Sequence, residues 1–299
     1  MNVGEIEKKF YLCKKIKHKN MKRHLLFGIG LALIALTSCG AKRDFAKHNL
    51  PPLEKVYAIN DSIIKEGWQL YYSERANWIA TDLVFERYDM AQLGSSVSWQ
   101  PKNNLWKVVF FDKGNENCVL DYQFDVASKE TVILDSVRPI SAEEVALLNR
   151  KNKLLEEGIK QYGDQMSFAT QSYGNPNIDI VRINDTLTRV YFLQGTVLPN
   201  VIPFGNDCSI DFNESQKPIA FRKYHQSLIS CPTQSEKGEA VTMIWHSHLK
   251  DNPFITPTDI CNFLLYRPAD MDSFCVFSTA YNCMYTYSLS LNQIIIELR

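Results

Sequence analysis

The stretch Val241–Asp259 reads VTMIWHSHLKDNPFITPTD and predicts a strand, a loop and the start of a helix. Its first residues are apolar, as in a buried strand, and His246 and His248 follow at the end of that strand. Side chains two residues apart on a strand point to the same side, so we expect the two imidazoles to lie together. Thr256 is a suitable helix N-cap, which places Asp259 in the first turn.

These residues form a candidate metal site. The strand and the helix bracket a ten-residue loop, so His246, His248 and Asp259 can converge on one tetrahedral ion. Three protein ligands would leave the fourth position for water, which is the arrangement expected of catalytic zinc. We therefore predict a zinc ion as cofactor. In the alternative interpretation the histidines are ordinary imidazoles, and Asp259 only stabilises the dipole of the helix.

The surrounding sequence predicts an α+β domain over residues 141–299. Ser141 and Glu144 form a capping box that opens a helix, and Gly163 is a natural stop. A second helix is expected over residues 256–265. Strands are predicted at 178–183, 189–193, 208–212, 219–224 and 241–245 before that helix, and at 274–278, 284–289 and 293–298 after it. This order favours an α+β sandwich of about 160 residues.

A smaller α+β domain is predicted over residues 53–140. Two helices open it, and the second of them begins at Ser73. Four short strands with polar turns follow, a pattern typical of an antiparallel meander, at 96–99, 105–111, 119–124 and 131–134. No cluster of titratable residues points to chemistry in this domain, so its role stays open.

The amino terminus resembles the signal peptide of a bacterial lipoprotein. The basic segment Met21–His24 precedes an apolar run, Leu25–Leu36, which is too short for the roughly 20 residues that span a bilayer. Leu36–Cys39 (LTSC) is similar to a lipobox, in which Cys39 would receive the lipid. We therefore expect a lipid anchor on the sulfur of Cys39.

This interpretation divides the N-terminal part of the chain and sets its location. We expect a signal peptide over residues 1–38, of which 1–20 precede a more typical start at Met21, and a lipidated linker over residues 39–52. The mature protein would be tethered through its lipid to a membrane of the bacterial cell envelope. Residues 1–38 hold eight of the 33 basic but two of the 33 acidic residues, so the remainder carries a formal charge of −6. A mildly acidic chain lacks the clustered cations that neutralise phosphates, so nucleic acid is not an expected partner.

The pattern His246-x-His248-x7-Thr256-x-x-Asp259 resembles the metal motif of the JAB/MPN family, also called the JAMM metalloproteases. That motif has Ser where this chain has Thr256, whose hydroxyl offers the same donor and acceptor. The resemblance implies a zinc ion held by both histidines and the aspartate, with Thr256 stabilising the oxyanion. It covers about residues 141–299 and implies a JAMM-like α/β sandwich there.

The general base is where this chain departs from the family. The resemblance implies a Glu upstream of the first histidine, on the strand after the first helix, but the chain has no Glu between Glu157 and Glu214. The matching strand carries Gln194 instead. Asp207 and Glu214 are candidates for the missing carboxylate, and His225 is a further polar residue near the site. General base catalysis contributes a factor of about 10² to 10⁴, so its loss would be severe.

Three functions are compatible with these observations. The first is a membrane-anchored zinc hydrolase that cleaves peptide or isopeptide bonds in a peptide or protein substrate. The second, which the missing Glu favours, is a catalytically degenerate module that binds metal or recognises a partner without cutting it. The third is a structural lipoprotein in which the spacing of His246, His248 and Asp259 is accidental. A carboxylate within about 5 Å of the metal-bound water would favour the first, because a base must reach the proton.

Overall fold

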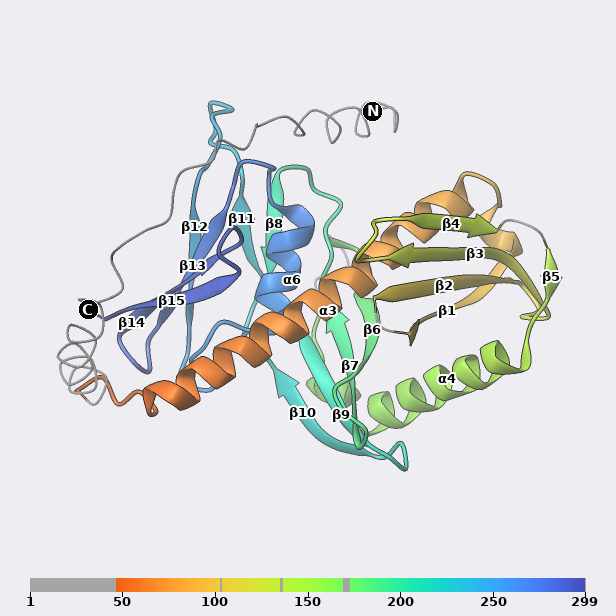
Figure 1. Ribbon diagram of the computed structural model, residues 1–299, viewed down its shortest axis with the longest axis horizontal. Helices are drawn as coiled ribbons and strands as arrows, with labels where there is room; N and C mark the ends of the chain where they lie inside the picture. The colour runs from red at the N-terminus through yellow and green to blue at the C-terminus, as the bar shows by residue number, and fades with distance from the viewer. Residues whose placement is uncertain (1–46, 103, 135–136, 169–172, 299) are drawn as a thin grey trace, which may run out of the picture. The chain divides into compact units, whose positions relative to one another are not determined.

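The computed structural model describes residues 47–102, 104–134, 137–168 and 173–298 (Figure 1). This described part belongs to one structural unit and combines α-helices with mostly antiparallel sheets, in agreement with the predicted α+β class. Within it, no helix is both long enough and apolar enough to span a bilayer. The predicted signal peptide and the lipobox with Cys39 lie outside the described residues.

Three α-helices organise the described residues. They are α3 (Leu53–Phe85), α4 (Ala142–Tyr162) and α6 (Pro257–Tyr266). The capping box predicted at Ser141 opens α4, and Gly163 is its C-cap. The helix start predicted at Ser73 is wrong, because α3 runs through this position without a break. The buried hydroxyl of Ser73 donates to Asp179 on a neighbouring strand, so it serves tertiary packing and not a helix cap.

The first sheet is an antiparallel meander, as predicted. Its strands are β1 (Leu93–Lys102), β2 (Leu105–Asp112), β3 (Asn117–Asp125) and β4 (Thr131–Leu134), in that order, with the short β5 (Arg138–Pro139) paired to β3. The sheet packs against the second half of α3, where Ala76 and Ala80 share a core with Val108 and Tyr122. Within the described residues β1 pairs only with β2, so no strand pairs with its other edge.

A second antiparallel sheet lies between two helices. It consists of β6 (Asn177–Arg182), β7 (Leu187–Leu193), β9 (Cys208–Asn213) and β10 (Pro218–Lys223), in the spatial order β10-β9-β7-β6. Helix α4 packs on one face through Leu154, which shares a core with Val190. Helix α3 packs on the other face through Leu70, which contacts the cluster of Tyr191. Neighbouring residues of β7 therefore face different helices, as the period of two requires.

The third sheet carries the chemistry-bearing segment. It consists of β12 (Ile244–His248), β13 (Ser273–Ser278), β14 (Cys283–Ser288) and β15 (Gln293–Leu298), in that order. Strands β12 and β13 are parallel, and α6 forms the crossover between them. Two further strands, β8 (Val201–Phe204) and β11 (Ile229–Pro232), pair with each other and were not predicted. Phe204 and Phe263 join this sheet to α6 in the largest core cluster.

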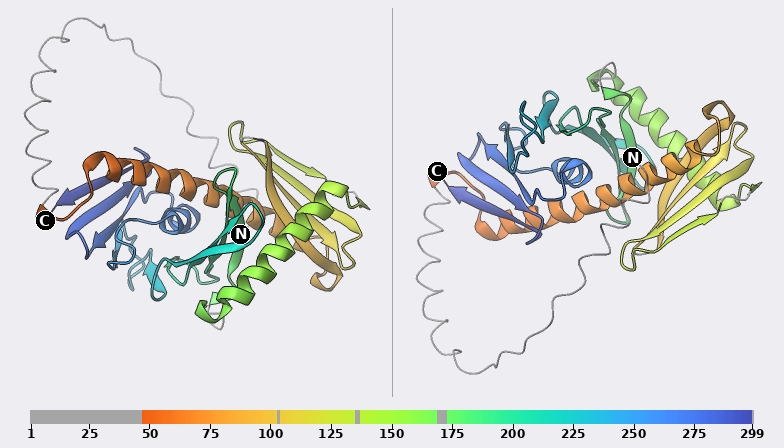
Figure 2. Two further views of the ribbon diagram at one scale, coloured as in Figure 1. Left: turned by 90° about the horizontal axis from the view of Figure 1, so that it is seen from below. Right: turned by 90° about the horizontal axis from the view of Figure 1, so that it is seen from above.

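Helix α3 links the regions that were predicted as separate domains. Its first half contributes Val56 and Ile64 to the core of the third sheet, and its second half covers the first sheet. Figure 2 shows it in orange, running from the blue strands β13–β15 to the yellow strands of the meander. The two regions on either side of residue 140 therefore share one long helix.

A close approach between α3 and α6 depends on Gly67. A Cβ atom at this position would lie 2.7 Å from the Cβ of Ile260 and 3.1 Å from the carbonyl oxygen of Pro257. The two helices can approach this closely only because residue 67 has no side chain. Since α6 begins at Pro257, this contact also positions the N-terminus of α6.

Replacing Gly67 by Ala is therefore expected to destabilise the protein by about 1–3 kcal/mol, because it overpacks the contact between the helices. Helix propensity alone would favour alanine over glycine by about 1 kcal/mol, so this term opposes the destabilisation caused by overpacking. Urea unfolding measures the difference. Ser62→Ala, at an exposed position of the same helix, is the matched control and should leave stability nearly unchanged. Equal stability of Gly67→Ala and the wild type would contradict the close contact.

Candidate metal centre

Strand β12 presents both predicted histidines to the interior. Its residues alternate, with Ile244, His246 and His248 buried and Trp245 and Ser247 exposed. The strand covers both histidines, whereas the prediction placed it at 241–245 and the histidines at its end. The alternation is the reason that the two imidazoles point the same way.

Helix α6 presents Asp259 in its first turn. Thr256 is the N-cap, and Pro257 occupies a first-turn position, where its missing N–H costs no helical hydrogen bond. The Asp259 N–H donates to the Thr256 hydroxyl at 3.2 Å, and Asp259 Oδ2 accepts from the Thr256 N–H at 2.8 Å and from its hydroxyl at 2.7 Å. This capping box fixes the carboxylate. Among the described residues, Asp259 Oδ1 accepts no hydrogen bond and faces the histidines.

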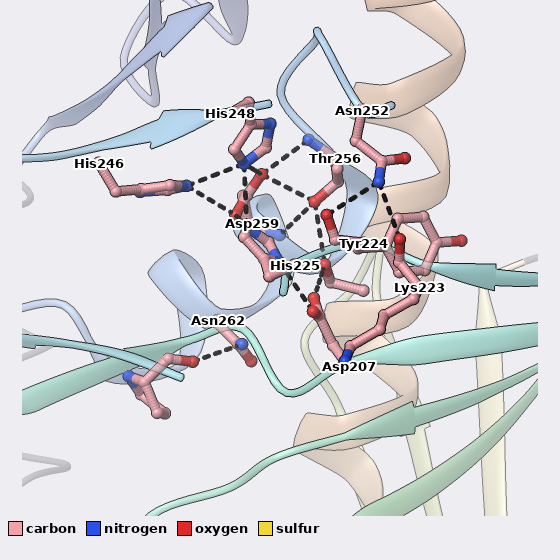
Figure 3. Close-up of polar contacts among 12 residues, drawn as sticks. Asp207, Lys223, Tyr224, His225, His246, His248, Asn252, Thr256, Asp259 and Asn262 are labelled. Atoms are coloured by element: carbon pink, nitrogen blue, oxygen red, sulfur yellow. Dashed lines mark hydrogen bonds and ion pairs between the residues drawn. The ribbon is translucent and has the colours of Figure 1, made fainter. Parts of the chain in front are cut away.

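A third imidazole, that of His225, completes the group (Figure 3). It follows β10 and precedes β11. Its Nε2 lies 2.9 Å from His248 Nε2 and 3.1 Å from Asp259 Oδ1. His246 Nε2 lies 3.1 Å from His248 Nε2 and 3.2 Å from Asp259 Oδ1. One ligand atom from each of these four buried residues lies within 4.8 Å of the others, so the group could hold a metal ion.

Hydrogen bonds behind the group orient two of the imidazoles. His248 Nδ1 lies 2.5 Å from the carbonyl oxygen of Phe254, and His225 Nδ1 lies 2.7 Å from Asp207 Oδ1. A carbonyl oxygen only accepts, so His248 Nδ1 carries a proton and Nε2 of the neutral ring keeps its lone pair. An ionised Asp207 favours the same tautomer in His225. The two Nε2 lone pairs would then face each other, and only a proton or a metal ion between them relieves their repulsion.

Asp207 is positioned by a tight turn between β8 and β9. Gly205 (φ 88°) and Asn206 (φ 51°) both adopt left-handed conformations, which Gly and Asn tolerate best. A Cβ atom on Gly205 would lie 2.1 Å from the carbonyl oxygen of Ser227. Only glycine therefore allows the loop before β11 to approach this turn. That approach brings the imidazole of His225 within hydrogen-bond distance of Asp207.

Burial and charge act in opposite directions on the pKa values of the group. Burial lowers the pKa of His248 to about 4, although the carboxylate of Asp259 opposes this shift. Burial also disfavours charge on His225, but the carboxylates of Asp207 and Asp259 raise its pKa well above the usual value. The pKa of Asp259 lies well below its usual value despite burial, because three imidazoles surround the carboxylate. An ionised carboxylate beside imidazole nitrogens is a suitable set of metal ligands.

Four of the six separations between the ligand atoms are close to those of neighbouring ligands on one ion. Bonds of about 2.0–2.1 Å at tetrahedral angles place neighbouring donor atoms about 3.3 Å apart. The distances given above run from 2.9 to 3.2 Å, and His248 Nε2 lies 3.4 Å from Asp259 Oδ2. Imidazole suits zinc, copper, iron and nickel alike, so these distances define the ligands and leave the choice of metal open.

The structure brings together the three residues that were predicted as ligands, His246, His248 and Asp259. It differs from the prediction at the fourth position, which was expected to hold water. The group contains a fourth residue, His225, whose Nε2 lies 2.9 Å from His248 Nε2 and 3.1 Å from Asp259 Oδ1. The group that could hold a metal ion therefore has four members, one more than was predicted.

Two of the predicted catalytic residues hold the ligands in place. Thr256 caps α6, and its hydroxyl donates to the carboxylate of Asp259. Asp207 is 1% exposed, and its two oxygens contact His225 Nδ1 and the hydroxyl of Thr258. Neither residue has a polar atom that is free to act on a substrate. Both instead support the orientation of a metal ligand.

Two other upstream residues do not contribute to the group. Glu214 is exposed in the turn after β9, whereas Asp207 precedes the same strand. The six residues of β9 span about 20 Å, so Glu214 lies far from the imidazoles. Gln194, at the position where the family resemblance implies the base, is buried and donates to the carbonyl oxygen of Gly174 at 3.1 Å. An amide in this position cannot accept a proton as a carboxylate does.

His225 is the functional residue that sequence reasoning did not identify as a ligand. It lies 21 positions before His246, and no spacing rule connects it with the motif. The only available signal was a histidine at the end of a predicted strand. Its role depends on the turn at Gly205 and on the hydrogen bond to Asp207, which are tertiary contacts.

A cavity of about 200 Å³ lies next to the metal group. His225 and His248 border it, together with Ser247, Asp251 and Asn252. The group is therefore buried but has one side near a recess in the surface. Comparisons with protein-family models, with curated proteins and with solved structures found no match to this chain, so functional conclusions depend on the geometry of this site.

Proposed function

We propose that this chain is a metal-binding lipoprotein of the bacterial cell envelope, in which a zinc ion is held by His225, His246, His248 and Asp259. The observation that carries the proposal is the position of His225. With this residue, four protein side chains could each supply a ligand atom to one ion, which is the number that structural zinc sites use. Catalytic zinc sites instead keep one position for water.

The outer hydrogen bonds favour zinc as the ion. Histidine ligands of zinc usually donate their second ring N–H to a carboxylate or a backbone carbonyl, which fixes the ring and its tautomer. The carboxylate of Asp207 and the carbonyl oxygen of Phe254 are in these positions. Three imidazoles and one carboxylate at tetrahedral separations are ligands that zinc accepts readily.

The ion would connect three segments of the fold. His225 comes from the loop after β10, the two other histidines come from β12, and Asp259 comes from α6. Such a site does not exist in the unfolded chain, so the free energy of metal binding adds to the stability of the folded state. We infer that zinc stabilises the region of β11, β12 and α6.

In this proposal the site is a degenerate form of the JAMM metal site. The motif residues are present, but the strand where the resemblance implies the Glu carries Gln194. Of the two substitutes, Asp207 contacts His225 and Glu214 is exposed in the turn after β9. We therefore place the chain among proteins that bind metal without hydrolysing a bond. Partner recognition is the function that remains for such a module.

The proposal is tested by the zinc content and the coordination of the purified full chain. We expect about one zinc ion per chain by elemental analysis, and an X-ray absorption spectrum fitted by three imidazole nitrogens and one oxygen at about 2.0–2.1 Å. His225→Ala should lose an imidazole from this spectrum. His48→Ala is the matched control, because His48 contacts the carbonyl oxygen of Tyr281 and is not part of the group. An unchanged spectrum in His225→Ala would refute the four-ligand site.

The cavity beside His225 and His248 favours a second candidate function, the JAMM-like hydrolase. In that case a substrate would occupy the recess, and His225 would leave the ion to admit water. Turnover of peptide or isopeptide substrates by the zinc-loaded wild type, and its loss in Asp259→Ala, would support this candidate. Zinc binding without turnover would support the binding module.

A further inference from the structure

A second site is indicated by a cleft of about 550 Å³ that shares no residue with the metal group. Its volume falls within the roughly 300–1,000 Å³ of typical ligand pockets. Its walls come from α3 and β1 on one side and from α4, β6 and β7 on the other. The cleft therefore lies where the meander meets the second sheet.

One wall of the cleft is the free edge of β1. The ammonium group of Lys151 on α4 donates to the carbonyl oxygen of Ser96 at 2.8 Å, so the backbone of Ser96 faces away from β2. Backbone groups on a strand alternate in direction, and Ser98 therefore faces the same way. Asn77 Nδ2 lies 3.2 Å from the hydroxyl of Ser98. Side chains of the protein thus already cover part of this edge.

The opposite wall includes the free edge of β6. The N–H of Ile183 donates to the carbonyl oxygen of Leu187 at 3.0 Å, in line with the pairing of β6 and β7. By the same alternation the backbone groups of Ile178, Ile180 and Arg182 face away from β7. All three residues line the cleft, and no described side chain bonds to their outward backbone groups. Within the described residues no strand pairs with this edge of β6.

The charged residues that line the cleft are all cations, although Arg182 also pairs with Asp185 at 2.9 Å. Lys102, Arg150, Lys151 and Arg182 line it, and no Asp or Glu does. Arg150 donates to the hydroxyl of Thr188 at 2.7 Å, and Lys151 donates to a backbone carbonyl, so neither of these contacts supplies a negative charge. Burial lowers the pKa of Lys151, although the carboxylate of Asp179 opposes this shift. An anionic side chain entering the cleft would compensate these charges.

We propose that this cleft binds an acidic peptide in extended conformation, which adds as a strand to the free edge of β6. Backbone hydrogen bonds to Ile178, Ile180 and Arg182 would supply affinity, as in other cases of strand addition. The cations around the cleft would select peptides rich in Asp and Glu. The proposal is independent of the metal, and it gives the meander a function as one wall of a binding site.

The test uses the full chain and two fluorescein-labelled ten-residue peptides, one alternating Glu with Val and the other Lys with Val. We expect fluorescence anisotropy to show binding of the acidic peptide and none of the basic one. Ile180→Pro removes an N–H that points away from β7 and makes no hydrogen bond to that strand. Loss of one hydrogen bond to the peptide should weaken its affinity about tenfold. Ile180→Val keeps this N–H and is the matched control, with the affinity of the wild type.

A second variant keeps the proposal testable if Ile180→Pro fails to fold, which circular dichroism would reveal. The side chain of Arg182 is 67% exposed, so the Arg182→Glu variant should fold normally. Its added negative charge should still weaken binding of the acidic peptide. Equal binding of both peptides, or none of either at millimolar concentration, would overturn the proposal. If inorganic phosphate displaces the acidic peptide and Ile180→Pro binds this peptide as tightly as the wild type does, strand addition is overturned. The cleft would then be a site for small anions. Zinc content should stay at the wild-type value in each variant.

Discussion

Substitution of His246 or Asp259 by Ala should remove zinc from the purified protein and lower its midpoint of thermal unfolding by about 8–16 °C. A metal present at about 1,000 times its Kd stabilises the folded state by about 4 kcal/mol. For a domain of this size each kcal/mol shifts the midpoint by about 2–4 °C. The effect should be large because both side chains are buried and would leave the remaining ligands without a partner.

A graded series makes this prediction specific to the metal. Asp207→Asn keeps all four ligands but weakens the orientation of His225, so we expect a loss of zinc affinity of about 10–100-fold. Ser247→Ala is the matched control, since Ser247 lies between the two ligands of β12 with its side chain exposed. Elemental analysis and thermal unfolding with and without a chelator measure the series. Equal zinc in the wild type and in both ligand variants would disprove the metal site.

Substitution of Cys39 by Ser should abolish incorporation of labelled lipid and move nearly all of the protein from the membrane fraction to the soluble fraction. The basis is the lipobox pattern of Leu36–Cys39, in which the sulfur of the cysteine is the acceptor. A hydroxyl at this position is not expected to replace the thiol in that reaction.

Ser38→Ala is the control for the lipobox, because it keeps a small residue before the cysteine and should still be labelled. Fractionation is repeated in high salt. At about 1 M salt the Debye length falls to about 3 Å, so electrostatic attraction between the protein and anionic lipids is screened. If Cys39→Ser stays with the membrane under these conditions, the lipoprotein proposal fails, whereas the metal site would be unaffected.

Local patterns predicted most of the secondary structure. Ser141 and Glu144 specify a helix start through contacts within one turn, and the structure has that capping box. The four strands of the meander follow from short runs rich in β-branched and aromatic residues with polar turns between them. These features depend on neighbours within a few residues, so a single sequence is enough to find them. Helix α3 was divided wrongly because Ser73 resembles a cap but bonds to a distant strand.

The metal ligands divide in the same way. The sequence by itself determined His246, His248 and Asp259, because the period of a strand and the first turn of a helix set their directions. Only the tertiary structure decided the fourth ligand. His225 reaches the group because Gly205 allows a close backbone contact and Asp207 holds the ring. Contacts between segments far apart in the chain leave no spacing pattern, so the fourth member of the group was visible only in the fold.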